Sequence, residues 1–147
     1  MRFGFVGISF VALTSLAASA ASAGMVNKKI AYNIGGQKFE GVLVYDDSVS
    51  AKRPAVLMAP NWMGVTESAV TKAKKLAGGK YVFFVADMYG AKIRPKNGKE
   101  AGKAAGAVRK NISMMRTRIN KAMDVLLAQG ASLGITNGGK TAAIGCC

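Results

Sequence analysis

These 147 residues contain no histidine, and their only two cysteines are neighbours at positions 146 and 147. A zinc site of the ordinary kind needs histidine or spaced pairs of cysteine, and the chain has neither. A disulfide framework needs cysteines distributed along the sequence, and a bond between adjacent cysteines would strain the backbone. We therefore expect neither a disulfide scaffold nor a metal site, and no other cofactor is indicated.

Acidic residues are also scarce, because seven of them stand against 21 lysines and arginines, for a net charge of +14. Ten of the basic residues lie between Lys92 and Lys121, where Glu100 is the only acid. A basic chain attracts anionic surfaces, anionic substrates or nucleic acid. The stretch lacks the interleaved aromatic residues on which bases stack, so we interpret it as a solvated helix face and expect no nucleic-acid partner.

The N-terminus has the three parts of a secretory signal peptide. Arg2 supplies the positive start, residues 3–16 are apolar, and Ala21-Ser-Ala23 is a small-x-small cleavage site. The segment is too short, and too rich in small polar residues near its end, to favour a membrane span over a signal. We expect a signal peptide over residues 1–23 and one domain over residues 24–147, exported to the periplasm and free of the membrane after cleavage. An uncleaved anchor helix is the alternative.

The mature part predicts an α/β fold. Two alternating segments flank Gly35-Gly36 and predict an antiparallel hairpin. Continuous apolar runs predict strands buried on both faces, at residues 54–59, 81–86 and 141–144. One helix is expected from Val65 or Thr66 to Gly78, and a second over residues 101–129, where the apolar spacing is helical. Strands that alternate with helices predict a parallel sheet with helices on both faces.

The chain ends in a sequence with chemical meaning. Gly145-Cys-Cys147 follows a predicted strand, as the first half of a G-x-S-x-G nucleophile elbow would, with cysteine in place of serine. In a parallel sheet, function collects at the C-terminal ends of the strands, and Asn61-Trp62, residues 87–94 and Cys147 all follow strands. Cys147 is therefore the candidate nucleophile. The alternative from the residues alone is a buried structural thiol.

Three segments together resemble the dienelactone hydrolase family of α/β-hydrolases: Asn61-Trp-Met-Gly64, Ala86-Asp-Met-Tyr-Gly90 and Gly145-Cys-Cys147. The resemblance runs from about Gln37 to the end of the chain. It implies a partial α/β-hydrolase fold and a Cys–His–Asp triad that opens small-molecule esters or lactones without a cofactor.

Carried over by position, the resemblance makes Cys147 the nucleophile and the backbone N–H of Trp62 one donor to the oxyanion. Asn61 stands where these enzymes carry a glutamate that partners the resting thiol, and an amide cannot do that acid's ionic work. The family places an arginine after Asp-x-Tyr to hold a substrate carboxylate, and Arg94 is the nearest residue of that type, a few positions late. Cys146 stands where a large aromatic residue is more usual.

These observations predict the N-terminal portion of a dienelactone hydrolase-like enzyme that breaks off at its nucleophile. Without a histidine, the 147 residues are expected to be inactive by themselves. The competing hypothesis is a non-catalytic, exported, basic α/β domain that binds anionic partners through residues 92–121. A third is a hydrolase that has lost its triad. The residues do not define an oligomeric state.

Overall fold

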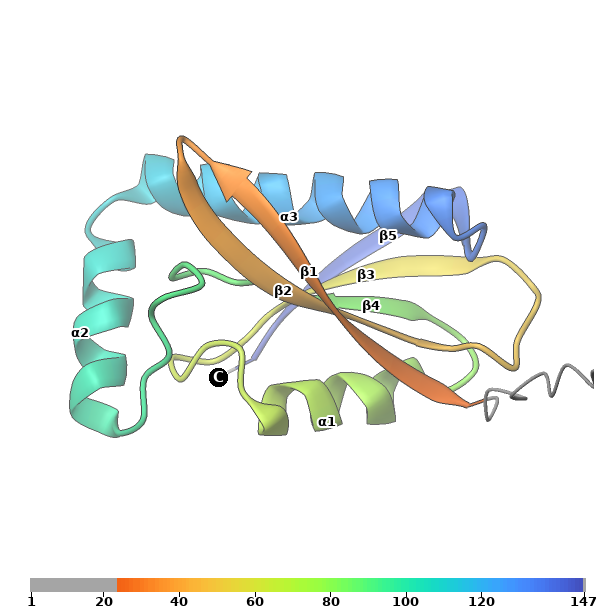
Figure 1. The fold of residues 1–147 in the computed structure, drawn as a ribbon, viewed down its shortest axis with the longest axis horizontal. Coiled ribbons are helices and arrows are strands. Elements are labelled where there is room, and N and C mark those ends of the chain that lie inside the picture. The colour runs from red at the N-terminus through yellow and green to blue at the C-terminus, as the bar shows by residue number, and fades with distance from the viewer. Residues whose placement is uncertain (1–23, 147) are drawn as a thin grey trace, which may run out of the picture.

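The computed structural model describes residues 24–146, so the predicted signal peptide at residues 1–23 and the predicted nucleophile Cys147 lie outside the described part. A five-stranded sheet in the order β1-β2-β4-β3-β5 forms the middle layer, with α3 on one face and α1 on the other (Figure 1). The elements along the chain are β1 (Met25–Ile34), β2 (Gln37–Asp46), β3 (Arg53–Ala59), α1 (Glu67–Ala77), β4 (Val82–Val85), α2 (Gly98–Arg109), α3 (Ile112–Ser132) and β5 (Thr136–Gly145).

The predicted hairpin is confirmed, and its turn explains why it forms. Gly35 and Gly36 have φ of 53° and 80°, so both occupy the left-handed region that a two-residue hairpin turn of the favoured twist requires. β1 and β2 then pair antiparallel without interruption from Ile34↔Gln37 to Met25↔Asp46. The hairpin joins the rest of the sheet through β2, which pairs antiparallel with β4.

The core consists of two apolar layers, one on each side of the sheet. Alternation along β3 sends Leu57 toward α3 and Met58 toward α1, and both are almost fully buried. All four residues of β4 are buried, as expected for a strand covered on both faces. On the α3 side, Phe84 packs where a side chain on Gly41 would stand, since a Cβ there would lie 2.3 Å from the Phe84 ring.

The single helix predicted over residues 101–129 is wrong, because the structure has two helices there. α2 ends at Arg109, and Asn111 then caps α3 by accepting a hydrogen bond from Met114 N at 2.9 Å. An asparagine side chain that binds the backbone in this way starts a new helix rather than continuing the old one. The break leaves Ile112 exposed and lets α2 cross the end of the sheet, away from the direction of α3 (Figure 1).

The last strand also differs from the prediction. β5 begins at Thr136, five residues before the predicted start at residue 141, and Gly138, with φ of 67°, lies inside it. The pairing with β3 shifts between Arg53↔Thr136 and Ala55↔Thr141, which marks a bulge. Residues 141–143 are exposed instead of buried on both faces, since β5 has a neighbouring strand on one side only within the described residues.

The described part of the chain has three helices, and none combines the length and the hydropathy of a membrane-crossing segment. The topology matters for function in another way. Because β3, β4 and β5 run parallel, their C-terminal ends lie at the same end of the sheet, which is also the end that α2 crosses (Figure 1). The loops that follow these strands therefore meet.

Candidate active site

A cavity of about 390 Å³ lies where the three strand ends meet α2. Its walls come from the loop after β3, the loop after β4, the end of β5, helix α2 and the first turn of α3. The lining residues are Ala59, Pro60, Asn61, Trp62, Met88, Tyr89, Ala105, Val108, Arg109, Met115 and Cys146. Within residues 24–146, no group of three or more potential ligands could hold a metal ion here or elsewhere.

The loop after β3 is a tight turn that starts at Asn61. The Asn61 carbonyl accepts from Gly64 N at 2.9 Å, and the Asn61 side-chain oxygen accepts from Met63 N at 3.0 Å. Asparagine favours this arrangement because its side chain reaches its own backbone two residues on. Gly64 ends the turn with φ of +77°, a conformation that other residues rarely adopt. The Asn61 oxygen is thus engaged within its own loop.

Among the described residues, the turn leaves the Trp62 N–H without a partner. The Trp62 N–H has no hydrogen-bond acceptor within residues 24–146, whereas the N–H groups of Met63 and Gly64 are both bonded. The Trp62 indole is 51% exposed and lies over the glycine face of α2, because a Cβ on Gly98 would stand 3.4 Å from the ring. Trp62, which lines the cavity, thus combines an exposed aromatic ring and a backbone donor without an acceptor in the described part of the chain.

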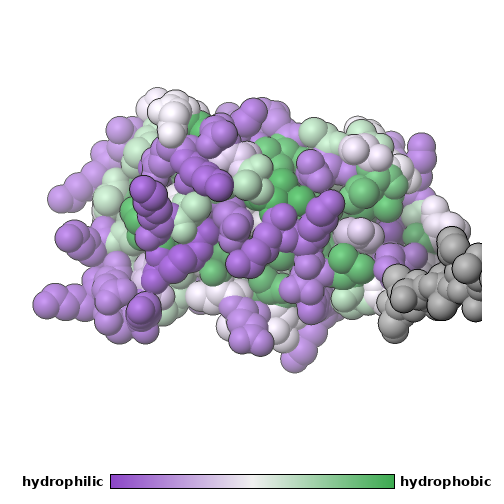
Figure 2. All heavy atoms as spheres, in the orientation of Figure 1, coloured by the Kyte–Doolittle hydropathy of each residue, from purple (hydrophilic) through white to green (hydrophobic). Residues whose placement is uncertain are grey.

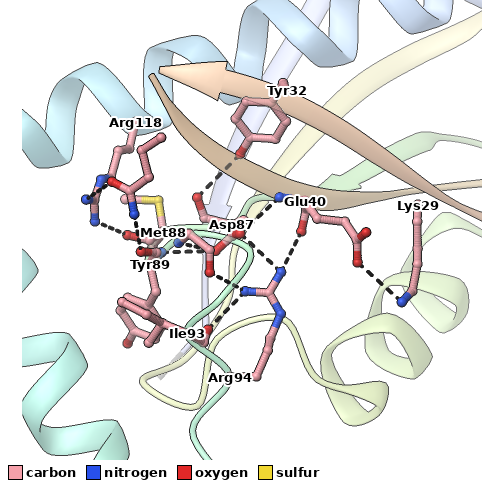
Figure 3. Close-up of polar contacts among 11 residues, drawn as sticks. Lys29, Tyr32, Glu40, Asp87, Met88, Tyr89, Ile93, Arg94 and Arg118 are labelled. Atoms are coloured by element: carbon pink, nitrogen blue, oxygen red, sulfur yellow. Dashed lines mark hydrogen bonds and ion pairs between the residues drawn. The ribbon is translucent and has the colours of Figure 1, made fainter. Parts of the chain in front are cut away.

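The loop after β4 is organised by Asp87, which is 1% exposed. One carboxylate oxygen accepts from Tyr89 N and Gly90 N, each at 3.0 Å. The other accepts from Glu40 N at 3.0 Å and from Arg94 Nη2 at 3.1 Å. Asp87 is thus a structural carboxylate at the centre of the network in Figure 3: its bond from Glu40 N ties the loop to β2, and the other three bonds hold the loop together.

Four consecutive backbone carbonyls at the start of this loop accept hydrogen bonds from side chains (Figure 3). The carbonyls of residues 87, 88, 89 and 90 accept in turn from Tyr32 Oη at 3.4 Å, Arg118 Nη1 at 2.6 Å, Gln37 Nε2 at 3.2 Å and Arg94 Nη1 at 2.8 Å. Arg94, the residue to which the family resemblance assigned a substrate carboxylate, does not line the cavity. Its guanidinium is occupied by Asp87 and by backbone carbonyls.

The pKa values of the neighbouring side chains follow from this burial. Burial, aided by the Asp87 carboxylate, raises the pKa of Tyr32 to about 12. Burial also raises the pKa of Tyr89, against the opposing influence of Arg109, so its hydroxyl stays protonated at neutral pH. Burial lowers the pKa of Arg118, although Asp87 opposes the shift. The Arg118 guanidinium remains charged and lies 5.1 Å from the centre of the Phe39 ring.

The end of β5 reaches the cavity through Cys146. The Cys146 N–H donates to the Ala59 carbonyl at 3.0 Å, which ties the end of β5 to the end of β3. Cys146 is half-buried and lines the cavity together with Asn61 and Trp62. The residue that follows it in sequence is Cys147, which is outside the described part. The structure thus brings the Asn61-Trp62 loop to the end of the strand that leads into Cys147.

Two residues of this cavity were not identified from the sequence. Arg109 is the one cation among the lining residues, and its Nε donates to Ala105 O at 3.4 Å within α2. Tyr89 lines the same cavity and donates its hydroxyl to Trp62 O at 2.8 Å. The helix break after Arg109 determines which of the basic residues reaches the cavity, and Asn111 was the sequence signal for that break.

A mixed sheet with this strand order, covered by helices on both faces and ending in a strand that leads into Gly-x-Cys, has the architecture of a partial α/β-hydrolase fold. A model described as the dienelactone hydrolase family matches residues 39–147. The chain belongs to the dienelactone hydrolase family. No curated protein matches it.

Solved structures agree with this assignment. The chain resembles a dienelactone hydrolase-like promiscuous phosphotriesterase from metagenomic libraries, at 27% identity and a TM-score of 0.75, and a protein named m3DLH, at 27% and 0.74. In both cases the match covers 84% of this chain and 50% of the other. It also resembles a dienelactone hydrolase from Anabaena variabilis, at 17% identity and a TM-score of 0.57, over 82% of this chain and 51% of that one. The chain therefore spans about half the length of these relatives.

Proposed function

We propose that this chain carries the nucleophile and part of the oxyanion site of a hydrolase that cleaves an ester or lactone. The observation that supports this most directly is that Cys146, at the end of β5, lies at the same cavity as the Trp62 turn. Cys146, the neighbour of the proposed nucleophile Cys147, lines the same cavity as Trp62, whose N–H has no acceptor within residues 24–146. A free backbone donor beside a nucleophile is the arrangement that stabilises a developing oxyanion.

The chemistry follows from these parts. The Cys147 thiolate would attack the carbonyl carbon, and the electron pair of the carbonyl would move onto the oxygen, where the Trp62 N–H binds it. The C–O bond to the leaving alkoxide then breaks and leaves a thioester, which water hydrolyses to the acid and the free thiol. A base must take and return the proton, and these 147 residues contain no histidine. The histidine of a Cys–His–Asp triad would therefore come from outside them, and the 147 residues by themselves would be inactive.

The test compares two proteins: the 147-residue chain and the protein translated from the complete reading frame. We expect the second to hydrolyse phenyl acetate or a small lactone, and we expect the first to be inactive because it lacks the proton-transfer base. Release of phenol is followed by absorbance. A reading-frame product that folds but hydrolyses neither ester nor lactone would contradict the proposal.

Arg109 would give the cavity a preference for anionic substrates, since among residues 24–146 it is the one lining cation and no acid lines the cavity. In the reading-frame protein, Arg109→Gln should lower kcat/KM for monophenyl succinate about tenfold and leave kcat/KM for neutral phenyl acetate unchanged, mainly through KM. Lys110→Gln is the matched control, because Lys110 does not line the cavity. Equal losses for both esters, or a similar loss in the control, would contradict this role.

A second candidate function is binding of a polyanion by the end of the molecule that α2 covers. Hydrophilic residues crowd this end in Figure 2. Of the basic residues between Lys92 and Lys121, eight are exposed: Lys92, Lys96, Lys99, Lys103, Arg109, Lys110, Arg116 and Lys121. This function predicts binding to a polyanion such as heparin that weakens with salt and ignores changes at Cys147. The hydrolase alone predicts no such binding.

We also propose export, on the basis of the first 23 residues. Arg2, the apolar residues 3–16 and Ala21-Ser-Ala23 form a secretory signal. The mature protein would then begin near Gly24 and act in the periplasm. The N-terminal sequence of the mature protein decides this point.

A further inference from the structure

The hydroxyl of Tyr89 bridges the two loops of the candidate site. It donates to the carbonyl of Trp62 at 2.8 Å, across 27 positions in the sequence. Within residues 24–146, this is the single hydrogen bond that joins residues 61–64 to another segment, since the other two bonds of the turn are internal to it. The two internal bonds shape the turn, and the Tyr89 bond is the one that holds it to another segment, so losing that bond should let the turn open more often.

We propose that Tyr89 is a positioning residue that holds the Trp62 turn where its free N–H can bind the oxyanion. The inference rests on the proposed hydrolase function and adds a residue to that same site. Tyr89 would not touch the reacting atoms. It acts through the turn, because a donor displaced by about 1 Å loses much of its effect on the transition state.

The loop that carries Tyr89 is fixed on every side. Each of its four backbone carbonyls, from residue 87 to residue 90, accepts a side-chain donor, and Asp87 binds the N–H groups of Tyr89 and Gly90. Tyr89 itself is 7% exposed. Because Tyr89 is held by several contacts and the Trp62 turn by few, we infer that Tyr89 positions the turn and not the reverse.

The packing around the ring fits this role. Gly64 ends the Trp62 turn, and a Cβ at Gly64 would lie 3.1 Å from the Tyr89 ring. The absence of a side chain at Gly64 thus lets the ring lie directly against the turn. The Tyr89 ring packs against Gly64, and its hydroxyl makes the hydrogen bond to Trp62 O. Removing the hydroxyl alone therefore tests the hydrogen bond without disturbing the packing.

The experiment compares Tyr89→Phe with wild type in the reading-frame protein. We expect kcat for phenyl acetate to fall about tenfold to a hundredfold, with KM within about twofold, because the lost interaction is made in the transition state. Affinity for an aldehyde that adds to the thiol, and so forms an oxyanion, should fall in parallel with kcat. The matched control is Tyr81→Phe. Tyr81 directly precedes β4, its hydroxyl has no hydrogen bond within the described residues, and kcat of this variant should stay unchanged.

Amide exchange provides a readout that does not require turnover. In Tyr89→Phe, the N–H groups of Met63 and Gly64 should exchange on the order of tenfold faster than in wild type, while those of β3 stay protected. Unchanged exchange, or a kcat within about twofold of wild type, would overturn the proposal. If the wild type were inactive but amide exchange were faster in the variant, the hydrolase proposal would be contradicted and the positioning of the turn by Tyr89 would be supported. The two failures are therefore distinguishable.

Discussion

Cys147→Ala in the reading-frame protein is expected to lower kcat for ester hydrolysis by at least about ten-thousandfold, with no change in thermal stability. A nucleophile that forms a covalent intermediate cannot be replaced by its neighbours, and losses of this order follow its removal in enzymes that use a triad. Activity would be measured with phenyl acetate, and stability by thermal unfolding. Residual hydrolysis above the rate in water would come from the remaining oxyanion donors.

The adjacent cysteine makes this experiment selective. Cys146 lines the cavity and donates its N–H to Ala59, but that bond is made by the backbone and survives Cys146→Ala. The Cys146 variant should therefore keep most of its kcat and should still be inactivated by iodoacetamide, whereas the Cys147 variant has no activity to lose. If the two variants behaved the other way round, the nucleophile would be Cys146 and the assignment from the G-x-C pattern would be wrong.

Local signals predicted most of the fold. Gly35-Gly36 specifies its hairpin because both residues need positive φ, and the apolar runs around Leu57 and Phe84 are buried on both faces as expected. The errors arose where a local choice depends on the rest of the chain. The apolar spacing from Val108 onward runs through Asn111 without interruption, but the capping bond of that side chain ends one helix and starts another. The exposure of residues 141–143 depends on which elements neighbour β5, and the spacing of apolar residues carries no information about those neighbours.

The candidate site was predicted in part for the same reason. Strand ends in a parallel sheet must meet, so the convergence of Asn61-Trp62 with the end of β5 could be expected from the order of elements. The sequence could not show which arginine lines the cavity, because nothing in the residues around Arg94 and Arg109 distinguishes the two. Arg94 is drawn to the buried charge of Asp87, and Arg109 reaches the cavity because α2 ends and turns there. Both outcomes require the tertiary structure.

Asp87→Asn should destabilise the protein by about 3 kcal/mol, because the change removes a buried negative charge and leaves its donors poorly paired without changing the shape of the side chain. The two oxygens of the Asp87 carboxylate accept two hydrogen bonds each. The donors are Glu40 N and Arg94 Nη2 for one oxygen, and Tyr89 N and Gly90 N for the other. An amide must place an NH₂ group against one of these pairs, so donors would face donors in a buried site. Urea unfolding gives the loss as a lower midpoint at constant slope.

The contribution of Arg94 can be separated from that of the backbone donors by a double-mutant cycle. Arg94 is 33% exposed along its side chain, so Arg94→Met should cost less than Asp87→Asn, and the double variant less than the sum of the two. Asp124→Asn is the matched control, because Asp124 is exposed on α3 and has no hydrogen bond within residues 24–146. A loss within about 1 kcal/mol for Asp87→Asn would contradict the structural role of this carboxylate. Since the same carboxylate holds the backbone of Tyr89, the destabilised variant should also share the slow kcat of Tyr89→Phe.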